Sequence, residues 1–341
     1  MKALVSHRHE SILKEVLRPG LQEGDVLLQV MACGVCFSDV HKIRFQALNE
    51  PSVLGHEVAG QVVESRSARF HVGDRVVVAH HVPCLHCHYC RHGNISMCAQ
   101  FKKTNLDPGG FADFVRVPVE HVESVAFSIP DGLTDNEASF MEPLGCCVRA
   151  VKRAGLQSSD VVVVVGLGSI GLLFVQLIRH VGAECIGLDL DPGRGQFART
   201  LGATATCAGS EPGFKESLAE ATNGRGVDAV FLTAGNPSLV PTMLSWLRAG
   251  GTCLVFASFH PDSEVRLDWN QLYYREINIV TSYSASPADL EEALNLLANG
   301  SVRVAPMSGH TFPLERFSEA LAAIEGRTIL KAIMNPGKDD E

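Results

Sequence analysis

The stretch VVVVVGLGSIG at residues 161–171 decides the fold, because it joins a wholly apolar run to three closely spaced glycines. Gly166, Gly168 and Gly171 have the spacing G-x-G-x-x-G, and the chain that follows has the pattern of an apolar helix. A strand, a glycine turn and a helix in this order are typical of a dinucleotide-binding βαβ unit. We expect Gly166 to allow the tight turn, Gly168 to let a pyrophosphate approach the backbone, and Gly171 to bring the helix against the sheet.

The start of this helix is the expected phosphate site, which makes Ser169 and Ile170 candidate cofactor-binding residues. Asp189 ends the next apolar run, where a carboxylate can accept both ribose hydroxyls of NAD and would repel the 2′-phosphate of NADP. Arg194 is close enough in sequence to soften that repulsion. Asp191, which precedes a proline, is interpreted as a turn or helix cap. The predicted cofactor is therefore NAD.

The chain around this motif has a regular rhythm of apolar, largely β-branched runs separated by stretches with helical character. The runs lie at 161–165, 185–189, 203–207, 227–232, 252–256 and 277–281. Strands that are apolar throughout and alternate with helices predict a parallel sheet covered on both faces. We expect an α/β, doubly wound Rossmann domain over 147–282.

The first part of the chain, residues 1–146, has a different pattern. Short strands separated by Gly, Pro and Asp turns are expected at 25–32, 58–65, 74–81 and 111–118. This pattern favours a compact, mostly antiparallel β domain. Residues 283–341 contain a helix capped by Ser286, a second helix over 313–326 and a closing strand at 329–336, and we expect this segment to return to the first domain.

Length and composition limit the classes of protein. The 341 residues favour two domains, and the net charge of −9 without a basic stripe argues against nucleic acid or an anionic membrane as a partner. No apolar run approaches the roughly 20 residues of a membrane span, and the start has no apolar signal-peptide core. We therefore expect a cytoplasmic protein, in which the 11 cysteines are metal ligands, reactive thiols or core residues instead of disulfides.

Four cysteines between residues 84 and 98 have the spacing of a metal site. Cys84, Cys87, Cys90 and Cys98 form the pattern C-x2-C-x2-C-x7-C. Four thiolates complete the tetrahedral shell of zinc and leave no position for a substrate, so we predict a structural zinc clamp. Three histidines lie between and beside them, at 86, 88 and 92. They could compete as ligands, but we interpret them as exposed loop residues.

A second set of metal ligands lies upstream. Cys36, in CGVCFSDVH, and His56 and Glu57, in GHE, offer a thiolate, an imidazole and a carboxylate. Such a mixed set is typical of catalytic zinc, which keeps a vacant or water-filled position.

These motifs together resemble the zinc-dependent medium-chain alcohol dehydrogenase family over nearly the whole chain. The motifs run in the family's order: MKALV, CGVCFSDVH, GHEVAGQVV, VGDRVVV, the cysteine clamp, GGFADFVRVP, MEPLGC and VVVVVGLGSIGLL. They are nearest to the sorbitol (polyol) and threonine dehydrogenase branches. The resemblance implies a GroES-like catalytic domain, one catalytic and one structural zinc per chain, NAD, and a homo-oligomer, either dimer or tetramer.

The resemblance also assigns the ligands of the catalytic zinc. It implies Cys36 as the thiolate ligand, with Cys33 as a small buried residue, and His56 as the second ligand. It places Glu57 and Glu142 near the position of the third protein ligand, where the two carboxylates either exchange or share the position with water.

Further roles follow from the same resemblance. Asp39 matches a residue that receives the His56 ring N–H, Ser38 matches the hydroxyl that contacts the substrate oxygen, and His41 matches the end of a proton relay to solvent. Phe37 departs from the family pattern, because a phenyl ring cannot pair with a pyrophosphate, and it would instead narrow the pocket.

The resulting hypothesis is a zinc- and NAD-dependent oxidoreductase that transfers a hydride from an alcohol, with a secondary alcohol of a polyol or sugar derivative as the first substrate class. An amino-acid side-chain alcohol, as in threonine, and a specialised metabolite are the alternatives. A zinc-free reductase of the same superfamily would lack Cys36, His56 and the four-cysteine lobe. A non-enzymatic NAD-binding protein would be favoured by loss of a ligand or relay residue, and none is lost.

Overall fold

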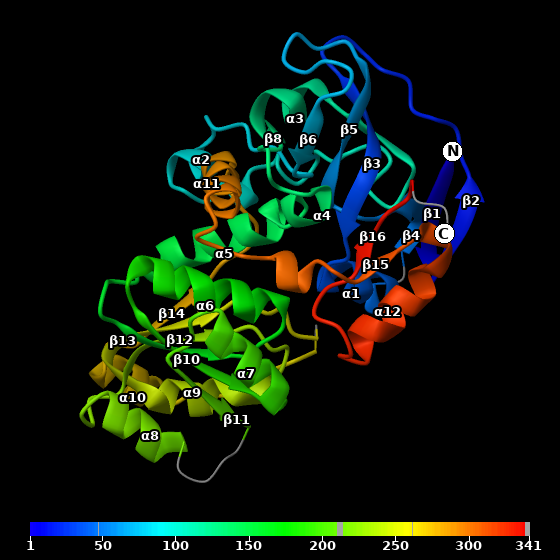
Figure 1. Cartoon of the computed structure of the whole chain (residues 1–341). Coiled ribbons are helices and arrows are strands. Elements are labelled where there is room, and N and C mark those ends of the chain that lie inside the picture. The colour runs from blue at the N-terminus through cyan, green and yellow to red at the C-terminus, as the bar shows by residue number, and fades with distance from the viewer. Residues whose placement is uncertain (47, 210–213, 261, 338–341) are drawn as a thin grey trace. The chain divides into compact units, whose positions relative to one another are not determined.

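The computed structural model describes residues 1–46, 48–209, 214–260 and 262–337. The chain divides into two compact units: Met1–Gly145 with Ala285–Glu341 form unit 1, and Cys146–Ser284 form unit 2. Helix α5 (Met141–Ala154) contains the first boundary between them. Figure 1 labels most of the helices and strands of both units.

Unit 2 is built on a six-stranded parallel sheet. Its strands are β9 (Val161–Val165), β10 (Glu184–Asp189), β11 (Ala205–Ala208), β12 (Val227–Leu232), β13 (Leu247–Val255) and β14 (Asn278–Thr281). The spatial order is β11-β10-β9-β12-β13-β14, with the first strand, β9, in the middle. Successive strands are added first on one side of β9 and then on the other, which is the order of a doubly wound sheet. All five residues of β9 are buried, as expected for a central strand covered on both faces.

Helices cover both faces of this sheet. They are α6 (Ser169–Val181), α7 (Pro192–Thr200), α8 (Phe214–Ala221), α9 (Val240–Trp246) and α10 (Trp269–Tyr274), with a short 3-10 turn η2 (Pro237–Leu239). Figure 1 shows α6 on one face and α9 and α10 on the other, as right-handed crossovers require. Gly182, with φ of +90°, ends α6, and the Asp191 side chain caps α7 by accepting the Gly193 N–H, so its interpretation as a cap is confirmed.

Unit 1 contains two sheets. The small one has the order β2-β1-β4, from β1 (Lys2–Arg8), β2 (Glu10–Glu15) and β4 (Leu48–Val53). The larger one has the order β15-β16-β3-β5-β6-β8, with β7 also paired to β3. Its strands are β3 (Val26–Gly34), β5 (Glu57–Ser65), β6 (Arg75–Val78), β7 (Phe114–Val117), β8 (Ala126–Ser128), β15 (Thr311–Phe312) and β16 (Ile333–Met334). Except for the parallel β15–β16 pair, its ladders are antiparallel.

The helices of unit 1 are mostly short. They are α1 (Phe37–Phe45), α2 (His88–Arg91), η1 (Ile95–Met97), α3 (Val119–Ser124), α4 (Asp135–Ala138), α11 (Pro287–Ala298), η3 (Ala305–Met307), η4 (Leu314–Arg316) and α12 (Phe317–Glu325). Ser286 caps α11 in a reciprocal capping box with Asp289, and Pro287 occupies the first turn. The helix expected over 313–326 begins as a 3-10 turn, and the closing strand is limited to two residues because its neighbour β15 is equally short.

None of the helices within the described ranges has the length and apolar character that a membrane span requires.

Candidate functional site

The donors expected at the catalytic zinc lie together in unit 1. Cys36 directly precedes α1, Glu57 begins β5, and His56 directly precedes that strand. The antiparallel pairing of β3 with β5 sets Gly34 opposite Glu57, which brings the two segments to one place. One donor atom from each of Cys36, His56 and Glu57 lies within 4.8 Å of the others. A soft thiolate, an imidazole and a carboxylate at this separation fit a zinc ion.

Asp39 contacts the imidazole of His56 on its Nδ1 side. Its Oδ1 is 3.4 Å from His56 Nδ1, and its Oδ2 accepts the Cys36 N–H at 3.1 Å. Burial on its own would lower the pKa of His56, but the Asp39 carboxylate and then Cys36 raise it well above its usual value. The same imidazole holds the pKa of Asp39 below its usual value against the effect of burial. A carboxylate behind Nδ1 leaves the other ring nitrogen to face Cys36 and a metal.

Lys331 is a residue of this site that the sequence reasoning missed. Its Nζ lies 2.6 Å from Glu57 Oε1 and 2.5 Å from Oε2, and the side chains of both residues are buried. A Cβ at Gly34 would collide with the Glu57 carboxylate, so glycine at this position leaves room for the ion pair. The available signal was a single lysine inside the apolar closing segment ILKAIM, because a buried charge requires a partner.

Glu142, the alternative third ligand, lies in the first turn of α5 and is buried. It stands outside the compact group of three donors. Burial lowers the pKa of Lys331, but Glu57, Cys36 and Glu142 raise it above its usual value. Lys331 is thus under the influence of both candidate carboxylates, and either remains a candidate for the third position.

The other residues expected at this site have different surroundings. Ser38 is exposed in the first turn of α1, next to Phe37, whose side chain is also exposed. His41 has a buried Nε2 with no hydrogen-bond partner among the described residues, and its ring packs on Phe45. Cys33 is fully buried, and burial raises its pKa well above the usual value, so its interpretation as a small core residue is confirmed.

A second residue missed by the sequence reasoning is His80. Its ring centroid lies 4.6 Å from that of His56 and 3.8 Å from that of His81, whose ring in turn packs on Phe101. Burial, followed by the charge of His56, lowers the pKa of His80 well below its usual value. The ring of His80 thus packs, tilted by 48°, against that of the candidate ligand His56, and burial disfavours its charged form. The signal in the sequence was the His-His pair at the end of a predicted strand.

The four cysteines of the predicted clamp converge. One sulfur from each of Cys84, Cys87, Cys90 and Cys98 lies within 4.8 Å of the others. The Cys84–Cys90 and Cys87–Cys90 sulfurs are 4.0 and 3.6 Å apart. A tetrahedral zinc with bonds of about 2.3 Å places its sulfurs about 3.8 Å apart. The spacing fits a four-thiolate zinc site.

The clamp thiols differ in acidity. Burial and then the neighbouring Cys87 raise the pKa of Cys90 to about 12. Burial acts in the same sense on Cys98, but the backbone N–H of Cys84, which points to its sulfur at 3.4 Å, and further backbone N–H groups lower its pKa to about 6. A cation among the four sulfurs would relieve their mutual repulsion as thiolates.

The glycine loop of unit 2 has the geometry that its spacing predicts. Gly166 has φ of +95°, and a Cβ at Gly171 would collide with the Gly166 carbonyl oxygen. At Gly168, by contrast, a Cβ would meet only Arg194 Nη1, at 3.9 Å. Packing therefore requires glycine at 166 and 171, whereas glycine at 168 leaves open space at the start of α6 that a phosphate could use.

Asp189 is held against this loop. Its Oδ2 accepts the Leu167 N–H at 2.6 Å and its Oδ1 accepts the Asp191 N–H at 3.0 Å. Both hydrogen bonds fix the carboxylate beside the glycine turn and leave lone pairs for two hydroxyls. Ser169 and Ile170 begin α6 directly after the loop, and both are partly exposed.

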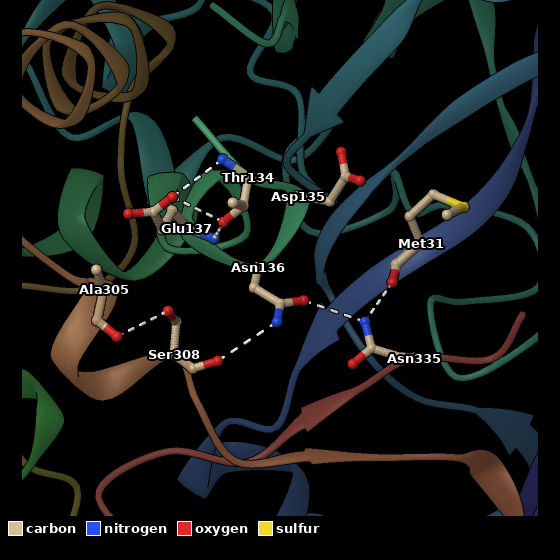
Figure 2. Close-up of a pocket in the computed structure, with 8 residues that line it drawn as sticks. All are labelled: Met31, Thr134, Asp135, Asn136, Glu137, Ala305, Ser308 and Asn335. Carbon is tan, nitrogen blue, oxygen red and sulfur yellow. Dashed lines mark hydrogen bonds between the residues drawn. The ribbon is translucent and has the colours of Figure 1, made fainter. Parts of the chain in front are cut away.

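A pocket of about 360 Å³ lies in unit 1 and contains none of the candidate ligands. It is lined by Met31, Thr134, Asp135, Asn136, Glu137, Ala305, Ser308 and Asn335. Figure 2 shows an amide network at its edge: Asn335 Nδ2 donates to Asn136 Oδ1 at 3.1 Å and to the Met31 carbonyl, and Asn136 Nδ2 donates to the Ser308 carbonyl at 3.4 Å. This network ties the C-terminal segment of unit 1 to β3 and α4.

Comparisons with known proteins define the class. Residues 22–130 match the family "Alcohol dehydrogenase GroES-like domain" and residues 169–299 match "Zinc-binding dehydrogenase". A sorbitol dehydrogenase from Bacillus subtilis (strain 168) is 32% identical, covering 94% of this chain and 92% of that protein. An L-threonine 3-dehydrogenase from Alteromonas mediterranea is 28% identical, with 94% and 95% covered.

Among solved structures, one from Sinorhizobium meliloti 1021 is described as a zinc-binding dehydrogenase and is bound to NADP. Its TM-score is 0.89 at 28% identity, and the match covers 98% of this chain and 99% of that chain. The chain belongs to the zinc-dependent medium-chain alcohol dehydrogenase family and is an oxidoreductase of that class. The predictions of family, fold class, enzyme class and a small-molecule alcohol substrate are confirmed.

Proposed function

We propose that the protein oxidises a secondary alcohol of a polyol or sugar derivative with NAD, using a zinc site at Cys36 and His56. The observation that carries the proposal is the group of Cys36, His56 and Glu57, whose donor atoms lie within 4.8 Å of one another. In this proposal unit 1 supplies the catalytic residues and the structural clamp, and unit 2 binds the dinucleotide.

When bound, zinc acts as a Lewis acid on the alcohol oxygen and NAD accepts the hydride. The residues of the chain prepare the site for this chemistry. Cys36 and His56 hold the metal, and the carboxylate of Asp39 fixes the ring orientation of His56 through Nδ1. Ser38 lies in the exposed first turn of α1. Its hydroxyl would receive the alcohol proton as its own proton leaves toward His41, which would release a proton to solvent.

Lys331 controls the charge of the site. The charges of Glu57, Cys36 and Glu142 all act on Lys331, and without it this set of anions would hold a metal tightly but would disfavour an anionic alkoxide. The buried ammonium of Lys331 neutralises Glu57 and so limits that negative charge. The third ligand is then Glu142 or water, or Glu57 after it leaves Lys331.

The position of Asp189 beside the glycine loop favours binding of NAD over NADP. Asp189 is fixed beside the loop by two backbone N–H groups, so a ribose phosphate would face its negative charge. The related structure from Sinorhizobium meliloti is bound to NADP, which makes this choice a specific property to test in the present chain. Arg194, whose Nη1 lies near Gly168, would moderate the preference.

The substrate class is supported by the relatives, one of which is named sorbitol dehydrogenase. A threonine-like substrate is the second candidate, because another relative is named L-threonine 3-dehydrogenase. The two classes differ in charge: threonine is a zwitterion, whereas a polyol is neutral.

A substrate panel tests the proposal. The purified protein should contain about two zinc ions per chain by elemental analysis, as one catalytic and one structural site require. NADH formation should be fastest with polyols that offer a secondary alcohol, and slower with primary alcohols and with threonine. Turnover confined to threonine would replace the substrate class by the alternative, and zinc-loaded protein without turnover on any alcohol would refute the proposal.

We also propose that the protein is a homo-oligomer, a dimer or tetramer. Strand β14 is the outer strand of the parallel sheet, and three of its four residues are exposed. Exposed aromatic side chains gather in α10 and after β14, namely Trp269, Tyr273, Tyr274 and Tyr283. An open strand edge beside large apolar side chains favours pairing with a second copy. Light scattering of wild type and of Ile279→Lys tests this, because a charge on the edge should favour the monomer.

A cytoplasmic location belongs to the same proposal. None of the 11 cysteines, all of which lie in the described ranges, forms a disulfide. Free thiols and thiolate metal sites fit a reducing compartment.

A further inference from the structure

The helix α2 on the four-cysteine lobe carries two exposed histidines one turn apart. His88 begins the helix and His92 directly follows its last residue, and their ring centroids are 4.2 Å apart with an interplanar angle of 34°. Residues separated by four positions project from the same side of a helix. Two imidazoles on one side at this spacing are a recurrent arrangement for holding a divalent transition-metal ion.

The ring of His92 is already oriented for such a role. Its Nδ1 lies 2.8 Å from the carbonyl oxygen of His88, which also accepts the backbone N–H of His92 at 3.3 Å. A carbonyl oxygen only accepts, so Nδ1 carries the hydrogen and Nε2 of the neutral ring keeps its lone pair. A carbonyl behind the non-ligating nitrogen is the usual support of a metal-binding histidine.

His88 supplies the second nitrogen. No hydrogen bond joins its ring nitrogens to any other residue in the described part of the chain, so either nitrogen can turn toward His92. Metal–nitrogen bonds of about 2.1 Å require the two nitrogens to approach to about 3 Å. Because the ring centroids are already 4.2 Å apart, rotation of the His88 side chain would turn one of its nitrogens toward Nε2 of His92.

We propose that His88 and His92 form a surface site for a divalent transition-metal ion, distinct from the four-cysteine clamp. Imidazole suits zinc, nickel and copper, while hard ions such as magnesium prefer oxygen. Both side chains are exposed, so water completes the coordination and the ion exchanges freely with solvent. The site does not depend on the proposed dehydrogenase activity.

Nickel binding to the zinc-loaded, tag-free protein tests the site. Equilibrium dialysis against Ni²⁺, with analysis of both metals, should show one nickel per chain in addition to the retained zinc. Loss of an outer hydrogen-bond partner alone costs a metal site about 10–100-fold in affinity, so loss of one of two ligands should cost at least about tenfold. We expect this loss for His88→Ala and for His92→Ala.

His86→Ala is the matched control. His86 is also exposed on the lobe and its Nδ1 also lies close to a carbonyl, that of Cys84 at 2.7 Å, but no second ring is recorded beside it among the described residues. His86→Ala should keep the nickel affinity. His88→Ala is the decisive variant, because it removes no hydrogen bond made by the ring. Nickel binding unchanged in His88→Ala, or lost equally in His86→Ala, would overturn the proposal, as would wild type that binds nickel only by displacing zinc.

Discussion

Lys331 and Glu57 form a buried ion pair across 274 residues of sequence, with Nζ 2.5 Å from Oε2 and only 6% and 0% of the two side chains exposed. Strand β16 places the lysine there, because Met334 and Ile333 pair with Cys33 and Gly34 at the end of β3. The pair therefore links the C-terminal segment to the candidate metal centre within unit 1.

Removal of the lysine should destabilise unit 1. Lys331→Met leaves the Glu57 carboxylate buried without its counter-ion, which costs about 3–5 kcal/mol in the free energy of unfolding. Denaturant unfolding followed by zinc analysis measures this. The double variant Lys331→Met with Glu57→Gln should recover part of the loss, because no charge is then left unpaired. A single variant as stable as wild type would mean that the Lys331 ammonium does not stabilise the buried Glu57 carboxylate.

The four-cysteine clamp should act on stability before chemistry. Cys90→Ser removes the sulfur that lies 3.6 Å from Cys87 and 4.0 Å from Cys84. Because zinc affinity in such sites is folding free energy, the protein should lose about one zinc and several kcal/mol of stability. Thermal unfolding and metal analysis check this. A variant with two tightly bound zincs and the wild-type melting temperature would show that the assignment is wrong.

Cys36 and Cys33 should respond in opposite ways. Cys36→Ala should abolish NADH formation and remove about one zinc per chain. Cys33 is fully buried, and its sulfur packs closely against Gly55 and Gly110. Cys33→Ala should therefore leave a small cavity that lowers stability, but it should keep the zinc and most turnover. An active Cys36→Ala protein with full zinc content would refute the catalytic site.

Asp189 should set the preference for NAD. A phosphate on the 2′-oxygen at about 4 Å from this carboxylate is repelled by roughly 4 kcal/mol at an effective dielectric constant of 20, an upper value. Half of that repulsion already exceeds about tenfold in affinity. Asp189→Ser should weaken NAD and narrow the gap to NADP, as kcat/KM for both cofactors will show. If wild type had equal kcat/KM with NAD and NADP, or if the variant kept the wild-type ratio, another residue would recognise the ribose.

Asp228 should make the stability of unit 2 depend on pH. Its Oδ2 accepts the Val161 N–H at 2.8 Å and its Oδ1 accepts Arg248 Nε at 2.5 Å. Burial raises the pKa of this carboxyl, but Arg248, the Val161 N–H and Arg225 lower it below its ordinary value of 3.8. Since the folded-state pKa is the lower one, the contribution is complete above the unfolded-state value of about 4 and is lost as pH falls through the folded-state value.

Asp228→Asn should therefore be less stable than wild type at pH 7, by about 2 kcal/mol for a hydrogen bond to a charged group. The difference should shrink as the pH is lowered below about 4. Denaturant unfolding at a series of pH values measures both curves. Curves that stay parallel down to low pH would show that the charge of Asp228 does not stabilise the fold.

Local pattern was sufficient for the parallel sheet and its glycine loop. Five consecutive β-branched valines that end at a glycine favour a strand covered on both faces, and the collision of a Cβ at Gly171 with the Gly166 carbonyl is a property of the turn itself. The clamp was equally local, because three of its cysteines lie within one helical turn or its flanks. Cofactor class and structural metal could therefore be predicted without any long-range contact.

The surroundings of Glu57, a candidate for the third ligand position, depend on tertiary structure. Glu57 adjoins His56 in sequence, yet its carboxylate is engaged by Lys331, whose position depends on the register of β16 against β3. The contact of His80 with His56 likewise depends on the pairing of β5 with β6, which no local pattern specifies. The sequence by itself determined which atoms could bind metal and dinucleotide, because ligand type and glycine spacing are local. Only the tertiary structure decided which charges meet, because the partners come from strands and helices far apart in the chain.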